Sequence, residues 1–320
     1  MSGLTLITGG LGYVGGRIAL NLLAQGVPIR LSSRRPPERW PDWARAAEFA
    51  HADVSSDDDL DDLCRGVETV IHLAAMNEHE SLADPAGAVA VNAIGTVRLL
   101  QACERAGVGR IVYVSTAHVY GAPLAGSINE RTLPRPVHPY AISHRIAEDF
   151  VLAAHDEGRI AGLVFRLSNG VGAPADAGVE RWTLVANDLC RQAVTTQKLV
   201  LQTDGWQQRD FIALADVARA VAHVLALPAG AWGDGLFNLG GETTLSVLEL
   251  AERIAARGRS VLGVTAPIER PARAEASPPP DLDYRIDKLK ATGFVLEGRL
   301  DDEIDRTLRL CKSAFAGADA

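Results

Sequence analysis

The first half of the chain alternates short apolar runs with longer segments of helical periodicity, from Leu4 to Leu167. This alternation is typical of repeated βαβ units, in which helices connect parallel strands by right-handed crossovers. It predicts an α/β fold with a doubly wound parallel sheet of six strands. The predicted strands are Leu4–Thr8, Ile29–Ser33, Glu48–Ala52, Thr69–Ala74, Arg110–Ser115 and Leu163–Leu167, and the predicted helices are Val14–Gln25, Ser56–Arg65, Ala88–Ala106 and Tyr140–His155.

The regular alternation ends after Asn169. Further elements are predicted as a helix near Thr183–Thr195, a helix with Asp216 as its N-cap, a short strand at Phe237–Leu239 and a helix at Ser246–Arg257. These pieces are too interrupted to form a core alone, so we expect a smaller C-terminal lobe over the carboxyl edge of the sheet, where such folds bind ligands. The main domain is predicted as 1–168, with 200–225 and part of 236–245 returning to it, and the lobe mainly as 169–320.

Charge and composition exclude several classes of protein. The chain has 32 Lys and Arg against 40 Asp and Glu, a net charge of -8, so it lacks the basic footprint of a nucleic-acid binder. No basic leader precedes an apolar run, and no run of about 18 uncharged apolar residues occurs, so we expect no membrane segment. Four cysteines lie far apart, which favours free thiols in a reducing cytoplasm and no metal site.

A glycine-rich turn lies between the first predicted strand and helix, in the run Thr8-Gly9-Gly10-Leu11-Gly12-Tyr13-Val14-Gly15. A dinucleotide pyrophosphate would meet backbone N–H groups and the positive end of the helix dipole there. Gly9 would allow the tight turn, Gly12 the approach of phosphate, and Gly15 the packing of helix on strand. The turn therefore predicts a dinucleotide-binding domain.

The end of the second strand indicates which dinucleotide is bound. An acidic residue there would hold the ribose 2′-hydroxyl of NAD, but this strand ends in Ser33, Arg34 and Arg35. Guanidinium groups pair with phosphate, so NADP is favoured, with NAD as the alternative. Asp53 after the third strand could accept from the adenine amino group or serve as a helix cap.

Several further motifs resemble the extended short-chain dehydrogenase/reductase family, which includes nucleotide-sugar epimerases, dehydratases and ketoreductases. The resemblance covers nearly the whole chain and implies a Rossmann domain with a smaller substrate-binding lobe. It rests on segments 8–15, 71–75 with Asn92, 115–121, Pro139-Tyr140, 166–169 and 209–211. The glycine register also places the ribose discriminator at Ser33, where members that use NAD carry Asp.

The resemblance also assigns roles to individual residues. Thr116 would hydrogen-bond the reacting oxygen and Tyr140 would be the acid/base, while His118, Asn169 and Arg209 would contact the substrate. Together with the turn and the strand ends, the implied cofactor contacts are Gly9, Gly12, Tyr13, Val14, Gly15, Ser33, Arg34, Asp53, Val54, Leu73, Ala74, Ala75, Tyr140 and His144.

One residue departs from the family pattern: His144 stands four positions after Tyr140, where the family has Lys. Residues i and i+4 share a helix face, and an ammonium about 5 Å from the phenol contributes about 3 kcal/mol, which lowers a Tyr pKa by about two units. A histidine is mostly neutral at pH 7 unless a phosphate raises its pKa. Either His144 still binds the ribose and supports a slower, more pH-sensitive enzyme, or turnover is lost and nucleotide binding remains.

The remaining motifs narrow the reaction. Family 4,6-dehydratases carry an Asp-Glu pair where this chain has Ala117 and His118, so dehydration is disfavoured. The preference for NADP favours reduction of a 4-keto nucleoside-diphosphate sugar by NADPH. The alternatives are a nucleotide-sugar 4-epimerase that retains its cofactor and a non-catalytic NADP-binding sensor or scaffold. The helices at 88–106 and 140–155 match the pair that forms a four-helix bundle in family dimers, which implies a homodimer.

Overall fold

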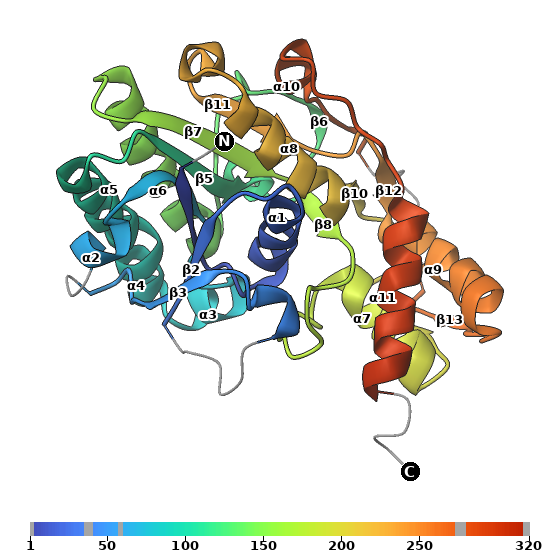
Figure 1. Cartoon of the computed structure of the whole chain (residues 1–320). Coiled ribbons are helices and arrows are strands. Elements are labelled where there is room, and N and C mark those ends of the chain that lie inside the picture. The colour runs from blue at the N-terminus through green and yellow to red at the C-terminus, as the bar shows by residue number, and fades with distance from the viewer. Residues whose placement is uncertain (1–2, 35–40, 57–59, 273–279, 316–320) are drawn as a thin grey trace.

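A parallel sheet of seven strands forms the centre of the computed structural model, which describes residues 3–34, 41–56, 60–272 and 280–315 (Figure 1). In spatial order the strands are β11 (Leu236–Leu239), β7 (Ala161–Leu167), β5 (Arg110–Thr116), β4 (Val67–His72), β1 (Leu4–Thr8), β2 (Ile29–Ser33) and β3 (Glu48–His51). Every neighbouring pair is parallel. The predicted doubly wound sheet is confirmed, but it has seven strands because the short segment at 236–239 pairs with β7.

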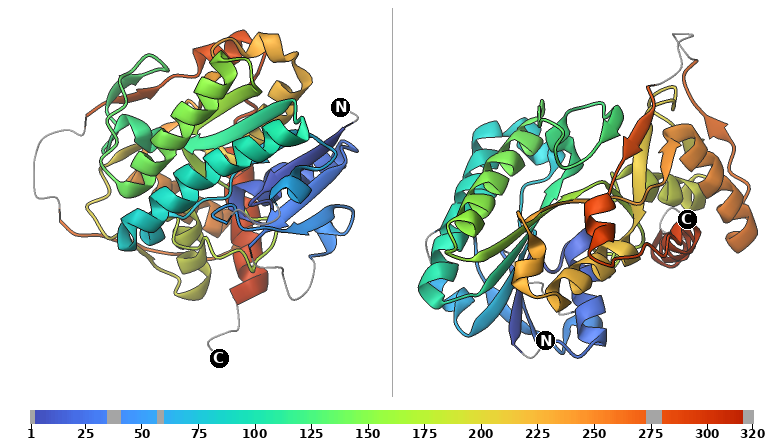
Figure 2. Two further views of the ribbon diagram at one scale, coloured as in Figure 1. Left: turned by 90° about the vertical axis from the view of Figure 1, so that its left-hand side faces the viewer. Right: turned by 90° about the horizontal axis from the view of Figure 1, so that it is seen from above.

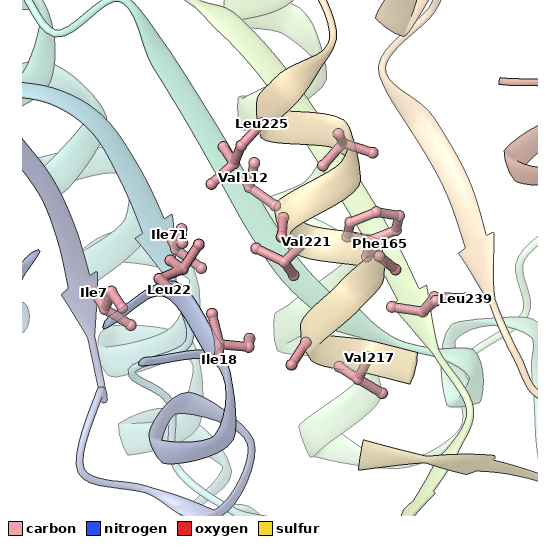
Figure 3. Packing of buried hydrophobic residues seen from close by; sticks show 14 of the residues in the cluster. Ile7, Ile18, Leu22, Ile71, Val112, Phe165, Val217, Val221, Leu225 and Leu239 are labelled. Carbon is pink, nitrogen blue, oxygen red and sulfur yellow. The ribbon is translucent and has the colours of Figure 1, made fainter. Parts of the chain in front are cut away.

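Alternate residues of each central strand point to opposite faces, and each face is covered by helices. The face that contains Ile7, Ile71 and Val112 packs against α1 (Tyr13–Ala24) and α8 (Leu214–Ala226), as Figure 3 shows. The face that contains Leu6, Val70 and Ile111 packs against α2 (Leu60–Cys64), α5 (Gly95–Ala106) and α6 (Pro139–Asp156). Both faces are therefore buried, as parallel sheets require.

The predicted helix at 88–106 is part of a longer helical stretch, α4 (Pro85–Ala88), a π-helical segment (Val89–Ile94) and α5. Among the described residues, this is the one stretch long and apolar enough to cross a membrane by length and composition alone. Half of its most apolar window is buried inside the protein, and it contacts α2 and α6. Those contacts are the ones that a core helix of this fold makes.

The C-terminal lobe has its own apolar core, between α7 (Val185–Thr195), α9 (Val247–Leu262) and α11 (Leu300–Phe315). These helices lie together beside the sheet (Figures 1 and 2). Its strands are β8 (Asn169–Val171), β10 (Gln208–Ala213) and β12 (Thr244–Ser246), with the pairs β9 (Leu199–Val200) and β13 (Ile268–Glu269), and β6 (Gly126–Ile128) and β14 (Leu282–Tyr284). The remaining helices are α3 (Glu78–Ala83), α10 (Asp287–Ala291) and the 3-10 turns Asp42–Ala44, Ala117–Tyr120 and Ala229–Trp232.

Asp216 does not cap α8, contrary to the sequence-based prediction. The helix begins at Leu214, with Ala213 as its N-cap, and Asp216 lies in its first turn. The Asp216 carboxylate accepts hydrogen bonds from the backbone N–H groups of Glu297 and Gly298, at 3.1 and 2.9 Å. It therefore secures a distant loop, a contact that local sequence does not reveal.

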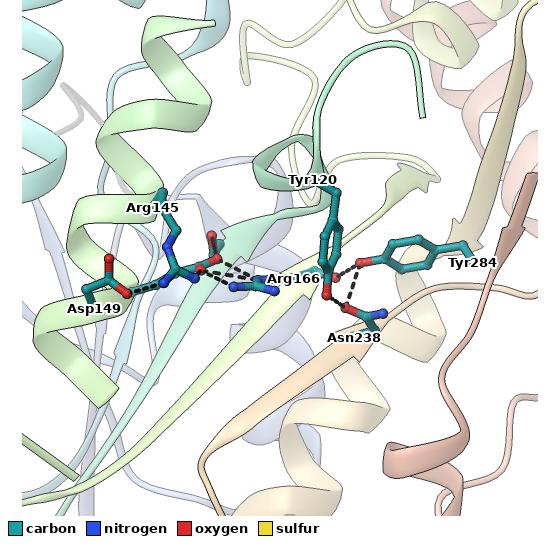
Figure 4. Close-up of polar contacts among 8 residues, drawn as sticks. Tyr120, Arg145, Asp149, Arg166, Asn238 and Tyr284 are labelled. Carbon is teal, nitrogen blue, oxygen red and sulfur yellow. Dashed lines mark hydrogen bonds and ion pairs between the residues drawn. The ribbon is translucent and has the colours of Figure 1, made fainter. Parts of the chain in front are cut away.

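A buried polar cluster joins the sheet to α6. Figure 4 shows the Arg166 guanidinium beside the Glu148 carboxylate, with Tyr120, Asn238 and Tyr284 continuing the chain of contacts. The Arg166 Nη2 lies 2.7 Å from Glu148 Oε2, and neither side chain is more than 1% exposed. This ion pair fixes the middle of α6 to β7, and the Ser115 hydroxyl of β5 donates to the same carboxylate.

Candidate active site

A cavity of about 610 Å³ opens at the carboxyl ends of the central strands. It is lined by the turn after β1, the ends of β2, β4 and β5, one face of α6 and residues 178–181 of the lobe. The predicted site residues that line it are Gly9, Gly12, Tyr13, Val14, Gly15, Ser33, Arg34, Val54, Leu73, Ala74, Ala75, Tyr140 and His144. Five other predicted residues are not on its lining: Asp53, Thr116, His118, Asn169 and Arg209.

The glycine turn between β1 and α1 has the geometry of a phosphate cradle. Gly9 has a positive φ of 66°, which favours glycine. A Cβ at Gly15 would lie 2.3 Å from the Gly9 carbonyl oxygen, so a side chain there would force the turn and the helix apart. No side chain caps α1 and its first turn has no acidic residue, so its positive end faces the cavity uncompensated.

Ser33 and Arg34, at the end of β2, line the part of the cavity where the sequence predicts the adenosine ribose. Arg35, which the NADP prediction also invokes, lies outside the described residues. The Asp53 carboxylate turns away from the cavity and accepts from the Ser55 backbone N–H and hydroxyl, at 2.8 and 2.6 Å. Asp53 therefore holds a local turn through one carboxylate oxygen.

Tyr140 and His144 lie side by side on α6 at the opposite end of the cavity. Their ring centroids are 4.4 Å apart. The helix presents both side chains to the cavity because it starts at Pro139, and His138 caps it by accepting from the Tyr140 backbone N–H. Asn92 secures the same turn from the neighbouring helical segment, by donating to the Ser143 hydroxyl at 2.9 Å.

Burial governs the protonation of this pair. It lowers the pKa of His144 to about 4, against a smaller opposing effect of Glu78, so the imidazole is neutral at pH 7. It raises the pKa of the Tyr140 phenol above its ordinary value, with a further increase from Glu78 and a decrease from Arg181. The cation that the resemblance implies beside the phenol is therefore missing from this position.

The hydroxyl predicted to bind the reacting oxygen does not line the cavity. Thr116 ends β5 and is 6% exposed, and its side chain accepts from the His118 backbone N–H at 3.2 Å, as the cap of a 3-10 turn. Ser115 lines the cavity instead. Its hydroxyl donates to Glu148 Oε1 at 2.6 Å, so it is held by the buried ion pair described above.

The three predicted substrate residues lie on the lobe side, beyond the cavity lining. Asn169 donates to the Asp210 carbonyl oxygen at 2.9 Å, and Arg209 donates to the Gln207 side chain at 2.9 Å. Burial lowers the pKa of His118, and the charge of Arg209 lowers it further, which places these two side chains in one electrostatic neighbourhood.

Two further side chains of the lobe, Asp210 and Trp182, are held by contacts within it. The Asp210 carboxylate accepts from Ser168, Gly241 and Thr243, and not from Arg209. Trp182 packs edge to face on Phe315 in the core of the lobe.

Sequence reasoning missed the residues that close the cavity from the lobe. The Nη2 atom of Arg181, in the segment between β8 and α7, lies 3.0 Å from Oε2 of Glu78 in α3. This ion pair joins the lobe to the main domain. Tyr113 of β5 was also missed. Its hydroxyl contacts the His144 imidazole. Because Tyr113 lies within an apolar strand pattern, the sequence gives no signal of this contact.

The residues of the cavity fit a dinucleotide. The turn between β1 and α1 leaves no room for added side chains, the N-terminus of α1 is uncompensated, and apolar strand ends follow. At the far end, the buried His144 Nε2 has no hydrogen-bond partner among the described residues. Fold and cavity together define a dinucleotide-binding site of the Rossmann type.

Residues 5–240 match the model of the NAD dependent epimerase/dehydratase family. A UDP-glucose 4-epimerase from Azospirillum brasilense is 30% identical over 290 residues, which cover 86% of this chain and 82% of the relative. A dTDP-6-deoxy-L-talose 4-dehydrogenase (NAD(P)(+)) from Kitasatospora kifunensis is 31% identical, over 67% of each chain.

Among solved structures, RMD from Pseudomonas aeruginosa, complexed with NADPH, is similar with a TM-score of 0.77. It is 25% identical, and the match covers 98% of this chain and 99% of that one. The chain therefore belongs to the NAD dependent epimerase/dehydratase family, as the sequence motifs predicted.

Proposed function

We propose that this protein is an NADP-dependent oxidoreductase that reduces a keto group, at C4, of a nucleoside-diphosphate sugar. The observation that carries the proposal is that the Tyr140 phenol is buried beside an uncharged His144. Burial and Glu78 raise its pKa, and the neighbouring His144 is neutral at pH 7. A phenol in this state is suited to donate a proton to a carbonyl oxygen and poorly suited to remove one from an alcohol.

Each part of the cavity would have a role in this reaction. The turn at 9–15 would hold the pyrophosphate, Leu73 to Ala75 would lie along the cofactor, and His144 would donate to a hydroxyl of the nicotinamide ribose. The chemistry that NADPH would supply there is a hydride for the carbonyl carbon, and Tyr140 would give its proton to the carbonyl oxygen, which completes the alcohol. Solvent would then return a proton to Tyr140, because burial and Glu78 raise the phenol pKa more than Arg181 lowers it.

The preference for NADP is supported by the end of β2. Ser33 and Arg34 both line the cavity, whereas the Asp53 carboxylate accepts from Ser55 and is not on the lining. A guanidinium with no carboxylate on the lining beside it favours a 2′-phosphate over a 2′-hydroxyl. The relatives named above include one designated NAD(P)(+) and one solved with NADPH.

The second candidate is a 4-epimerase that retains its cofactor, which the name of the Azospirillum relative favours. An epimerase needs its acid/base to remove a proton in one half-reaction and to return one in the other. A neutral His144 does not assist the removal, so this candidate requires that the bound cofactor raises the pKa of the imidazole.

The deciding experiment mixes the purified protein with NADPH and a panel of 4-keto nucleotide sugars and follows NADPH absorbance and sugar products together. Stoichiometric oxidation of NADPH with formation of the alcohol supports the reductase. Conversion of a 4-hydroxy nucleotide sugar to its epimer without net NADPH consumption would establish the epimerase. Tight binding of NADPH without turnover of any sugar would indicate a nucleotide-binding protein that is not an enzyme.

We also propose a cytoplasmic homodimer. Large apolar side chains are exposed on one surface of the helical layer: Ile94 at 47%, Ile142 at 40% and Phe150 at 46%. α5 and α6, whose layer carries them, lie side by side at the outside of the molecule (Figures 1 and 2). Light scattering tests this pairing, because a monomer has a mass of 34.0 kDa. All four cysteines are free and buried, which fits a reducing compartment.

A further inference from the structure

Tyr113 of β5 lies beneath the candidate site and is 2% exposed. Its hydroxyl oxygen is 2.6 Å from the Nδ1 atom of His144, at the distance of a strong hydrogen bond. The two rings are nearly parallel, at 29° with centroids 5.7 Å apart. The sheet thus contributes a phenol that holds the imidazole of α6.

The surroundings of this contact decide which atom donates. Among the described residues, the Tyr113 hydroxyl has no hydrogen-bond partner other than His144. If Nδ1 carried the proton and donated, the hydroxyl proton would be buried without an acceptor, which is costly. The hydroxyl therefore donates to Nδ1, and the single proton of the neutral imidazole resides on Nε2.

The Nε2 atom is where this arrangement meets the cavity. His144 is 3% exposed and lines the cavity, and its Nε2 has no partner among the residues that the structure describes. A buried N–H without an acceptor is rare in a folded protein. A ligand oxygen in the cavity would supply the missing acceptor.

Among the described residues, the neighbouring titratable groups are already paired or uncharged. His72 of β4 faces the pair from across the Tyr113 ring, but both of its nitrogens are bonded, to Thr8 at 2.6 Å and to Thr96 at 3.0 Å. Glu78 of α3, which favours the charged imidazole, is paired with Arg181. The remaining titratable neighbour, Tyr140, lies on the same helix.

We propose that Tyr113 is a positioning residue: it fixes His144 as the Nε2–H tautomer, so that the imidazole donates a hydrogen bond to a hydroxyl oxygen of the bound dinucleotide. The inference deepens the proposed function, on which it rests. Tyr113 and His144 then act as one unit that orients the ribose without a positive charge. The Nδ1–H tautomer would present a bare nitrogen to the cavity, and it could only accept from the same hydroxyl.

The first test observes the tautomer directly in the full chain without cofactor. Nitrogen NMR of protein labelled in its histidines distinguishes the two tautomers, with His144→Gln used to assign the signals. We expect the Nε2–H pattern in the natural protein and a mixture of tautomers in Tyr113→Phe. Tyr284→Phe is the matched control, because it removes another buried phenol hydroxyl, one that donates to the Arg166 carbonyl at 2.7 Å. An Nδ1–H pattern in the natural protein, or no change in Tyr113→Phe, would overturn the inference.

The second test measures NADP+ binding by calorimetry in a double-mutant cycle. Tyr113→Phe should weaken binding by about 3- to 10-fold, the effect of one hydrogen bond, in the natural background. In a His144→Gln background, the same change should weaken binding less than about twofold, since no tautomer remains to be fixed. Equal losses in both backgrounds would show that Tyr113 acts by general packing and would refute the inference.

These readouts separate this inference from the proposed function. Neither the tautomer nor NADP+ binding requires turnover of a sugar. A protein that shows the coupling but reduces no keto sugar would refute the reductase and retain the role of Tyr113. A protein that reduces keto sugars but lacks the coupling would support the reductase and refute the role of Tyr113.

Discussion

The Tyr140 ring meets the His144 imidazole edge to face, with the ring planes at 65°. Both side chains come from one turn of α6, and both line the cavity. Any charge on position 144 is therefore felt directly by the phenol. Because the imidazole is neutral, the Tyr140 phenol keeps its proton and can donate it. The predictions that concern activity follow from that state.

Replacing the imidazole by an amine should increase the fraction of Tyr140 that is phenolate, the form that can remove a proton. His144→Lys places an ammonium about 5 Å away, worth about 3 kcal/mol, so the Tyr140 pKa should fall by about two units. We expect alcohol oxidation by NADP+ at pH 8 to 9 to rise by about tenfold or more, and the pH optimum to move down. Steady-state rates across pH 6 to 10 measure this. His144→Gln, which stays neutral, should show no gain, and an identical profile for all three proteins would contradict the prediction.

The end of β2 should set the choice between the two dinucleotides. Arg34→Ala should weaken NADP+ binding by about tenfold, because one charged hydrogen bond is lost, and should leave NAD+ binding nearly unchanged. Ser33→Asp should weaken NADP+ further through repulsion of the 2′-phosphate. Arg45→Ala removes an exposed arginine that pairs with Asp42 outside the cavity and serves as the control. Equal losses for NADP+ and NAD+ would mean that Arg34 does not read the 2′ position.

Stability should fall in mild acid because His144 is buried neutral. Its folded pKa is about 4, against an ordinary value of 6.5, so between these values the unfolded chain binds a proton that the folded protein excludes. Stability from this source is complete above pH 6.5 and is lost as the pH falls toward 4, at up to about 1.4 kcal/mol per pH unit. Asp210 contributes the opposite slope, since burial raises its pKa to about 6.

The measurement is therefore a difference between variants. Urea unfolding at pH 4.5 to 7 should show a shallower acid loss for His144→Gln than for the natural protein. His79→Gln removes an exposed histidine and should leave the slope as it is. A slope that is the same in all three proteins would show that His144 is not buried in its neutral form.

Breaking the buried ion pair should cost far more than breaking its exposed neighbour. Glu148→Gln leaves the Arg166 guanidinium buried without a counter-charge, and we expect a loss of about 3 to 5 kcal/mol in the free energy of unfolding. Asp149→Asn breaks the adjacent pair with Arg145, whose aspartate is 56% exposed, and should cost less than about 1 kcal/mol. Denaturant unfolding compares the two. Similar losses would mean that water reaches the Arg166 guanidinium.

The sequence predicted those parts of the molecule that depend on local periodicity. The six strands between Leu4 and Leu167 and the turn at 9–15 follow from apolar spacing and glycine positions, and all are present. The seventh strand could only be recognised as a short apolar run, since its place beside β7 is a long-range pairing. Asp216 was misjudged for the same reason, because its partners lie 81 and 82 residues away.

Within the site, the sequence located side chains but not their environment. Tyr140 and His144 share a helix face by spacing alone, and the structure places both on the cavity. The Thr116 hydroxyl caps a turn, which depends on how the chain bends after β5. The pKa of His144 and its contact with Tyr113 arise from packing between a helix and a strand 31 residues apart, which no local pattern encodes.

The first and last helices are held together by Arg17 of α1 and Glu303 of α11, whose atoms meet at 2.5 and 2.8 Å across 286 residues of chain. Glu303 also accepts from the Ala215 backbone N–H at the start of α8. Because Arg17 follows the phosphate turn, this ion pair ties the helix that begins at that turn to α11, far along the chain. A nascent chain that had emerged only as far as α8 would therefore present the β1–α1 turn on a helix that still lacked this partner.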